Sequence, residues 1–239
     1  MGVRAALERA GKVRLHAQLA SDPRAHAWTL SLYRAGERHP ETVDDYFPVE
    51  RARERWPELA ASMKRHAGDE RGHAALYAKA IERSGQAVLD IDPGDVFNVV
   101  IRAHTRASWR IGESDTSDDV RLKLAHFLAH AHFLEKRVTR SLRYHAEGCR
   151  RAGRSEIADV VDRVLADEER HVGYTGEAIV ELTRPGEREH VLAIHAEGEA
   201  RADRAFSARQ LRTFLSRWGA SLPRVDRSFY AASALLLEL

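Results

Sequence analysis

The chain has 239 residues, and 38 Lys and Arg against 36 Asp and Glu leave a formal net charge of +2. With 31% charged and 44% hydrophobic residues and no apolar run near 18 residues, the composition excludes a membrane-spanning protein and a disordered chain. Basic residues alternate with acidic ones instead of forming blocks, so the charge pattern does not signal nucleic-acid binding. We expect one globular domain without membrane contact.

The first half of the chain predicts two long helices. Only 15 Gly and 7 Pro interrupt a sequence rich in helix-forming residues. Asp22 and Pro23 are typical of a helix start, and that helix should run to about residues 37–40. Three prolines between residues 40 and 57 predict a bent or broken connection. A long helix then follows over about residues 57–84, with Gly85 as its stop.

The second half predicts further helices and no strand. Asp92 and Pro93 should start a shorter helix over about residues 92–111, and a polar run over residues 112–119 separates it from the next. Gly148 and Gly153 are expected to bracket a tight turn that carries Cys149. The expected long helices cover about residues 118–147, 155–182 and 187–218, with a short apolar helix after Pro223 that docks on the rest of the fold.

The lone cysteine, Cys149, bears on location and chemistry. One cysteine cannot form an intrachain disulfide or a Cys-rich metal site, which fits a reducing compartment. The N-terminal segment lacks the continuous apolar stretch of a signal peptide, so we expect a cytoplasmic protein. We interpret Cys149 as a surface or packing thiol.

Two segments repeat each other at a displacement of 98 residues (135 − 37 = 98). Each copy contains an Asp-Glu-x-x-His motif, and a single Glu precedes the motif's Glu by 33 residues (70 − 37 = 33 and 168 − 135 = 33). A chain of this composition carries about one Glu-x-x-His by chance. The unmatched Glu187-x-x-His190 is that copy, because Arg154 stands where its upstream Glu would be. The matched pairs are Glu37 with Glu135, Asp69 with Asp167, Glu70 with Glu168, and His73 with His171.

The repeat predicts a buried metal centre. A Glu and a His three positions apart on a helix lie one turn apart on neighbouring faces, so both can bind one ion. If each half is a helical hairpin, residues at similar distances from its turn come level with each other. Two paired hairpins would then point four carboxylates and two imidazoles inward. Several buried acids are costly without cations, so we favour metal over an ordinary solvated face.

On these residues the sequence resembles the ferritin-like di-iron carboxylate superfamily, over about residues 22–183. The resemblance implies an all-α fold, a ferritin-like four-helix bundle with an extra helix between its two hairpins and additional C-terminal helices over about residues 187–239. One domain would span residues 1–239. The motifs that carry the resemblance are Glu37, Asp69-Glu70-Arg71-Gly72-His73, Glu135 and Asp167-Glu168-Glu169-Arg170-His171.

The resemblance also implies roles for these residues. Glu70 and Glu168 would bridge two metal ions and take part directly in catalysis, Glu37 and Glu135 would be terminal carboxylates, and His73 and His171 would each bind one ion. Asp69 and Asp167 would hydrogen-bond the ligating imidazoles, and twofold symmetry pairs Asp69 with His171 and Asp167 with His73. The resemblance puts two iron ions first, although the ligand types also suit manganese.

The function implied is that of a di-iron oxidase or oxygenase, which would use O2 to oxidise or hydroxylate a small organic substrate. It would need an external electron donor such as a ferredoxin or a reductase, because the chain has no Rossmann fingerprint and no cysteine framework. The inserted and C-terminal helices fit poorly in a storage cage, and one cysteine cannot build the four-cysteine iron site of a rubrerythrin. These helices could instead shape a substrate pocket or the interface of a homodimer.

Three alternatives stay open from the sequence. The first is a ferroxidase or peroxide-scavenging protein, for which a large hollow oligomer is expected. The second is a tRNA-modifying hydroxylase, which arginine-rich surfaces would suit. The third is a helical interaction protein with a structural ion or none. Neighbouring histidines at positions 126, 130 and 132 could relay protons, but we interpret them as partly buried helix residues. We assign the aromatic residues Trp28, Tyr33, Trp56, Phe127, Phe133 and Tyr174 to core packing before a channel.

Overall fold

The computed structural model describes the backbone of residues 3–238 and the side chains of residues 9–238. Within these residues the fold is all-helical, as the sequence predicts, and has no strand. The α-helices are α1 (Val3–Ser21), α2 (Pro23–Arg38), α3 (Val49–Arg53), α4 (Pro57–Arg83), α5 (Phe97–His104), α6 (Ser117–Arg151), α7 (Ser155–Leu182), α8 (Pro185–Trp218) and α9 (Arg224–Leu236), with 3₁₀ turns at His39–Thr42, Pro93–Asp95 and Gly219–Ser221.

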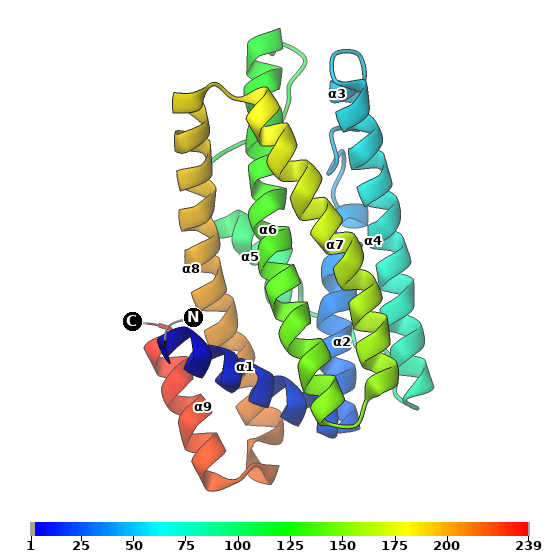
Figure 1. The fold of residues 1–239 in the computed structure, drawn as a ribbon, viewed down its shortest axis with the longest axis vertical. Helices are drawn as coiled ribbons and strands as arrows, with labels where there is room; N and C mark the ends of the chain where they lie inside the picture. The colour runs from blue at the N-terminus through cyan, green and yellow to red at the C-terminus, as the bar shows by residue number, and fades with distance from the viewer. Residues whose placement is uncertain (1–2, 239) are drawn as a thin grey trace.

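Four long helices lie side by side and form the centre of the fold (Figure 1). α2 packs against α4, α6 packs along most of its length against α7, and α4 contacts α7. The direction of each chain segment in Figure 1 shows that both pairs are antiparallel. α8 lies on the outer side of α6, while α1 crosses the end of α6 that leads into α7. The two antiparallel pairs therefore face each other across a shared interior.

Local sequence signals explain the ends of these helices. The Asp22 carboxylate accepts hydrogen bonds from the backbone N–H of Arg24 and Ala25, and Pro23 occupies the first turn of α2. Thr116 and Asp119 form a reciprocal capping box at the start of α6. Gly85 and Gly153, which follow α4 and α6, have φ of 72°, a conformation that side chains with a Cβ rarely adopt.

Two of the apolar clusters of the core lie on opposite sides of the carboxylates along the long helices. One includes Leu30, Tyr77, Leu142 and Val161, near the α6–α7 turn. The other lies toward the far ends of the same helices, and its fully buried members include Met63, Leu128, Phe127 and Ile179. Glu70 lies between Met63 of one cluster and Tyr77 of the other, and Glu168 lies between Val161 and Ile179. The carboxylates are therefore enclosed between two hydrophobic layers.

Two expectations about local structure are wrong. Asp92 and Pro93 start only a 3₁₀ turn, and the inserted helix is shorter than residues 92–111 because Val96 is extended and α5 spans Phe97–His104. The Asp92 side chain satisfies the N–H of Gly94 and does not cap a longer helix.

Gly148 does not belong to a turn, since α6 continues through it to Arg151. A Cβ at Gly148 would lie 2.7 Å from backbone atoms of His16 and Ala17, so this glycine allows α1 to cross α6 closely. Cys149, expected in that turn, is a buried helical residue instead.

The outer helices close one end of the four-helix interior. α9 docks on α8, as expected for the C-terminal segment, and buries Tyr230 and Ala234. Its other apolar residues, Val225, Phe229, Leu235 and Leu236, remain exposed. Among the described residues, none of the helices combines the length and the apolar character that crossing a bilayer requires.

Candidate metal centre

The six residues predicted as metal ligands come together in the interior of the four long helices. Glu37 lies on α2, Glu70 and His73 on α4, Glu135 on α6, and Glu168 and His171 on α7. Each of these six residues is at most 7% exposed. Residues that are 98 positions apart in the sequence therefore face each other across one buried site.

Their donor atoms divide into two adjacent groups. Glu37, His73 and Glu168 form the first group, and each offers a ligand atom within 4.8 Å of the others. Glu70, Glu135 and His171 form the second group together with His66, at the same closeness. Glu37 lies beside His73 in the first group, and Glu135 lies beside His171 in the second. Both groups could hold a metal ion.

Glu168 connects the two groups. One carboxylate oxygen lies 3.2 Å from Nδ1 of His73, and the other lies 2.9 Å from Nδ1 of His171. Glu70 also borders both groups, because its carboxylate lies 2.9 Å from Nε2 of His66 and shares a hydrogen bond with Glu37. These two Glu residues are the ones for which the sequence predicted bridging positions.

Each motif Asp contacts the histidine of the other motif, in the pairing expected from the repeat. The His73 Nε2 atom lies 3.0 Å from Asp167, and the His171 Nε2 atom lies 3.1 Å from Asp69. Arg170 donates to both Asp residues, at 2.9 Å and 2.7 Å, and links the two pairs. Such bonds fix the orientation of each ring, so that Nε2 faces its Asp and Nδ1 faces the carboxylates of the centre.

His66 is a member of the centre that the sequence did not reveal. Its position is one helical turn before Glu70, and the residue 98 positions later is Val164, so the repeat contains no second copy. The His66 ring stacks on His171 with centroids 3.6 Å apart. Its Nδ1 bonds to the hydroxyl of Tyr174 at 2.8 Å, which leaves Nε2 facing Glu70 and Glu135. The centre therefore offers three imidazoles.

Burial and mutual repulsion dominate the electrostatics of the four carboxyl groups. Burial, and next the charge of Glu168, raise the pKa of Glu37 to about 7. Burial and neighbouring carboxylates hold the pKa of Glu70 and of Glu135 well above the usual range. Burial acts in the same direction on Glu168, but hydrogen bonds with His171 and His73 outweigh it and lower its pKa. Glu168 is the carboxyl that stays ionised most readily.

The chemistry of these residues is suited to holding a metal ion. Burial lowers the pKa of His73, but hydrogen bonds and the charges of Glu168 and Glu37 outweigh it and raise this pKa to about 12, so a protonated His73 balances part of the carboxylate charge. Arg170 binds Asp69 and Asp167 and none of the four Glu. A buried carboxylate needs a counter-charge or a proton, and metal binding supplies the counter-charge. Carboxylate oxygens and imidazole nitrogens are suitable ligands for iron and manganese.

The histidines upstream of Glu135 lie outside the centre. His126 bonds to His195 at 3.1 Å, and buried His130 packs against Trp109. His132 bonds to Val172 and Thr175 on α7. The structure therefore agrees with their interpretation as partly or fully buried helix residues.

A large cavity reaches the carboxylates from the side covered by α1, α8 and α9. Its volume is about 1190 Å³, and all four Glu residues of the centre line its inner end. The walls are mainly apolar and aromatic, with Trp28 and Tyr33 among them, so part of the aromatic set assigned to the core lines this channel. Val225 and Phe229 line it and are 78% and 52% exposed. A second cavity of about 10 Å³, the size of one water molecule, adjoins His66, Glu70 and Glu135.

Comparisons of the chain with protein-family models, with curated proteins and with solved structures find no match. The functional interpretation therefore depends on the residues and geometry of the centre and of the cavity beside it.

Proposed function

We propose that this protein is a non-haem di-iron enzyme of the ferritin-like type, an oxidase or oxygenase that uses O2 to oxidise an organic substrate. The observation that supports this most strongly is the combination of a buried carboxylate and imidazole cluster with a large apolar cavity that ends at it. A purely structural metal site does not need such a cavity.

Under this proposal Glu37 and His73 hold one ion, and Glu135 and His171 hold the other. Glu70 and Glu168 would supply carboxylate oxygens to both sites, since each contacts both groups of ligands. His66 adds a nitrogen donor to the second ion only, so the two ions would have unequal surroundings. When bound, the irons supply the electrons that activate O2, with manganese as the alternative metal.

The protein residues orient and insulate this centre. Asp69 and Asp167 hold the rings of His171 and His73, which directs each Nδ1 inward, where it would bind a metal ion after losing its proton. The two apolar clusters exclude water above and below the carboxylates. Tyr174 bonds to His66 and is the buried hydroxyl nearest to that nitrogen, where it can hold a proton.

The cavity defines the class of substrate. Its volume slightly exceeds the ~300–1,000 Å³ usual for small-molecule sites, and its walls are largely apolar. We therefore propose an elongated, predominantly apolar organic molecule, whose reacting carbon or nitrogen lies at the inner end beside the four Glu residues. The electron donor would be a separate ferredoxin or reductase.

Oxygen uptake after anaerobic loading with Fe(II) tests the proposal. The loaded protein should consume O2 faster than free Fe(II), and Glu70→Ala and Glu168→Ala should abolish the difference. Glu187→Ala is the matched control, because Glu187 belongs to the third Glu-x-x-His but binds Arg121 outside the centre. Equal uptake by the wild type and both site variants would show that the enzyme proposal is wrong.

A ferroxidase would give a different result in the same experiment. It would consume O2 in proportion to added Fe(II) over many turnovers and would form a large hollow oligomer. The apolar cavity favours an organic substrate instead, so we expect uptake to stop after one cycle unless both a reductant and a substrate are present.

A further inference from the structure

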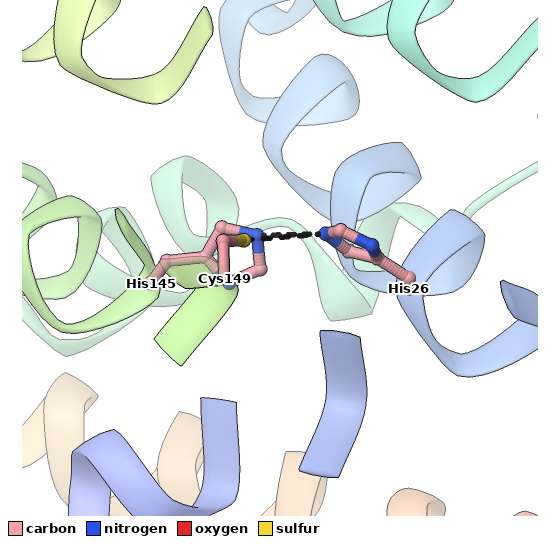
Figure 2. Close-up of side chains that lie close together, drawn as sticks. All are labelled: His26, His145 and Cys149. Carbon is pink, nitrogen blue, oxygen red and sulfur yellow. Dashed lines mark hydrogen bonds between the residues drawn. The ribbon is translucent and has the colours of Figure 1, made fainter. Parts of the chain in front are cut away.

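A second cluster of potential metal ligands lies away from the carboxylates. Figure 2 shows His145 and Cys149, which extend from α6, facing His26 on α2. His145 follows Glu135 by ten residues, which corresponds to about 15 Å along the helix. The three residues are 0–3% exposed. This His–Cys cluster is therefore a separate, fully enclosed site.

The distances within the cluster match those between ligands of one ion. Nε2 of His26 lies 3.2 Å from Nε2 of His145 and 3.6 Å from Sγ of Cys149. Metal–nitrogen and metal–sulfur bonds of about 2.0 and 2.3 Å at a tetrahedral angle place two nitrogens about 3.3 Å apart, and a nitrogen and a sulfur about 3.5 Å apart. All three donor atoms lie within 4.8 Å of one another.

The cluster is held in place by the crossing of α1. Gly148 lets α1 approach α6, which brings Nδ1 of His16 to 3.1 Å from Nδ1 of His145. That hydrogen bond occupies the outer nitrogen of His145 and directs the other toward His26. Tyr33 packs edge-on against the His145 ring with centroids 5.2 Å apart. Both contacts preset the ring for binding through Nε2.

Without a metal ion, the two Nε2 atoms and the Cys149 sulfur cannot all be satisfied by hydrogen bonds among themselves. Two Nε2 atoms face each other, so only one of them can carry a hydrogen and the other must accept it. The Cys149 thiol then points at a nitrogen that is already bonded.

We propose that His26, His145 and Cys149 bind one thiophilic transition-metal ion of the Zn²⁺ or Cu⁺ class. A donor set of two imidazoles and a thiolate suits these ions, whereas the carboxylate centre suits iron or manganese. Binding releases the thiol proton of Cys149 to solvent, one H⁺ per ion, and gives the thiolate a counter-charge. The cavity is lined by His16 and Tyr33, and both of these residues contact His145.

Titration of the metal-free protein with Co²⁺ tests this site independently of the proposed function. The chain has one cysteine, so any thiolate-to-cobalt charge-transfer band in the near ultraviolet reports on Cys149. We expect the band to saturate at one equivalent, to persist in Glu168→Ala, and to disappear when Zn²⁺ or Cu⁺ is added. Competition between these two ions then identifies the preferred one.

Two variants and a matched control complete the test. Cys149→Ser and His26→Gln should each lose the band. His126→Gln is the control and should keep it: His126 is also on α6 and contacts another histidine, but it has no cysteine beside it. If the wild type shows no band, or if the band survives in His26→Gln, the cluster is a hydrogen-bonded network and the proposal is wrong. The wild-type result decides this even if Cys149→Ser does not fold.

Discussion

Replacing Glu37 by Gln should stabilise the metal-free protein at neutral pH. Below about pH 4.5 this carboxyl is protonated in both the folded and the unfolded chain. As pH rises from 4.5 to about 7, the unfolded chain loses the proton while the folded one keeps it, so the folded state loses stability. At 1.36 kcal/mol per pKa unit, the difference between 4.5 and about 7 corresponds to about 3 kcal/mol. An amide cannot titrate, and its carbonyl can still accept the hydrogen bond from His73.

Urea unfolding in the presence of a chelator measures this effect. At about pH 4.5 wild type and Glu37→Gln should unfold at the same urea concentration, and at about pH 7.5 the variant should be more stable by up to about 3 kcal/mol. Exposed Glu177→Gln on α7 is the control and should change stability by less than about 0.5 kcal/mol at either pH. With saturating Mn²⁺ or anaerobic Fe²⁺ the order should reverse, because only the wild type offers the full ligand set.

A Glu37→Gln variant that is less stable than the wild type at pH 7.5 without metal would refute the reasoning. It would mean that the Glu37 carboxylate is already neutralised by protein groups. The buried acids would then need no metal to explain them.

Three other predictions follow from particular contacts. Asp167→Asn should weaken metal binding about 10–100-fold, measured by competition with a chelator, because His73 loses its carboxylate partner; unchanged affinity would contradict that role. Gly148→Ala should destabilise the protein by about 1–3 kcal/mol in thermal unfolding, because its Cβ would lie 2.7 Å from the α1 backbone. Gly173→Ala, with nothing within 4 Å of its Cβ, should instead stabilise it by about 0.5–1 kcal/mol, and equal effects would disprove the close crossing. Leu32→Trp should fill part of the cavity and reduce binding of the apolar dye anilinonaphthalene sulfonate several-fold without changing metal content; unaltered dye binding would show that the cavity does not accept apolar molecules.

The repeat predicted the carboxylate centre well because a repeated helical hairpin places equivalent residues at equivalent heights. Glu37 and Glu135 lie level with Glu70 and Glu168 for this reason, and the Asp–His pairs follow from the same symmetry. Helix boundaries were predictable where a capping residue or a proline determines them, as at Asp22 and Pro23.

Features that depend on how helices cross could not be read from the repeat. His66 has Val164 as its counterpart, so symmetry conceals it although it lies one turn from Glu70. Glycine is common in turns, so the sequence suggested a turn at Gly148. Only the close approach of α1 shows that Gly148 is a contact point inside a helix. His26 and Cys149 are 123 residues apart, and their contact exists because α1, α2 and α6 meet at one end of the fold.

The number of iron ions bound per chain tests the central claim most directly. The wild-type protein should be loaded anaerobically with Fe(II) and desalted, because the His–Cys cluster favours Zn²⁺ or Cu⁺ and should not add to the iron count. A two-metal centre predicts two irons per chain, and fewer in Glu168→Ala, whose carboxylate contacts both His73 and His171. One iron or none in the parent protein, or two in Glu168→Ala, would contradict the account.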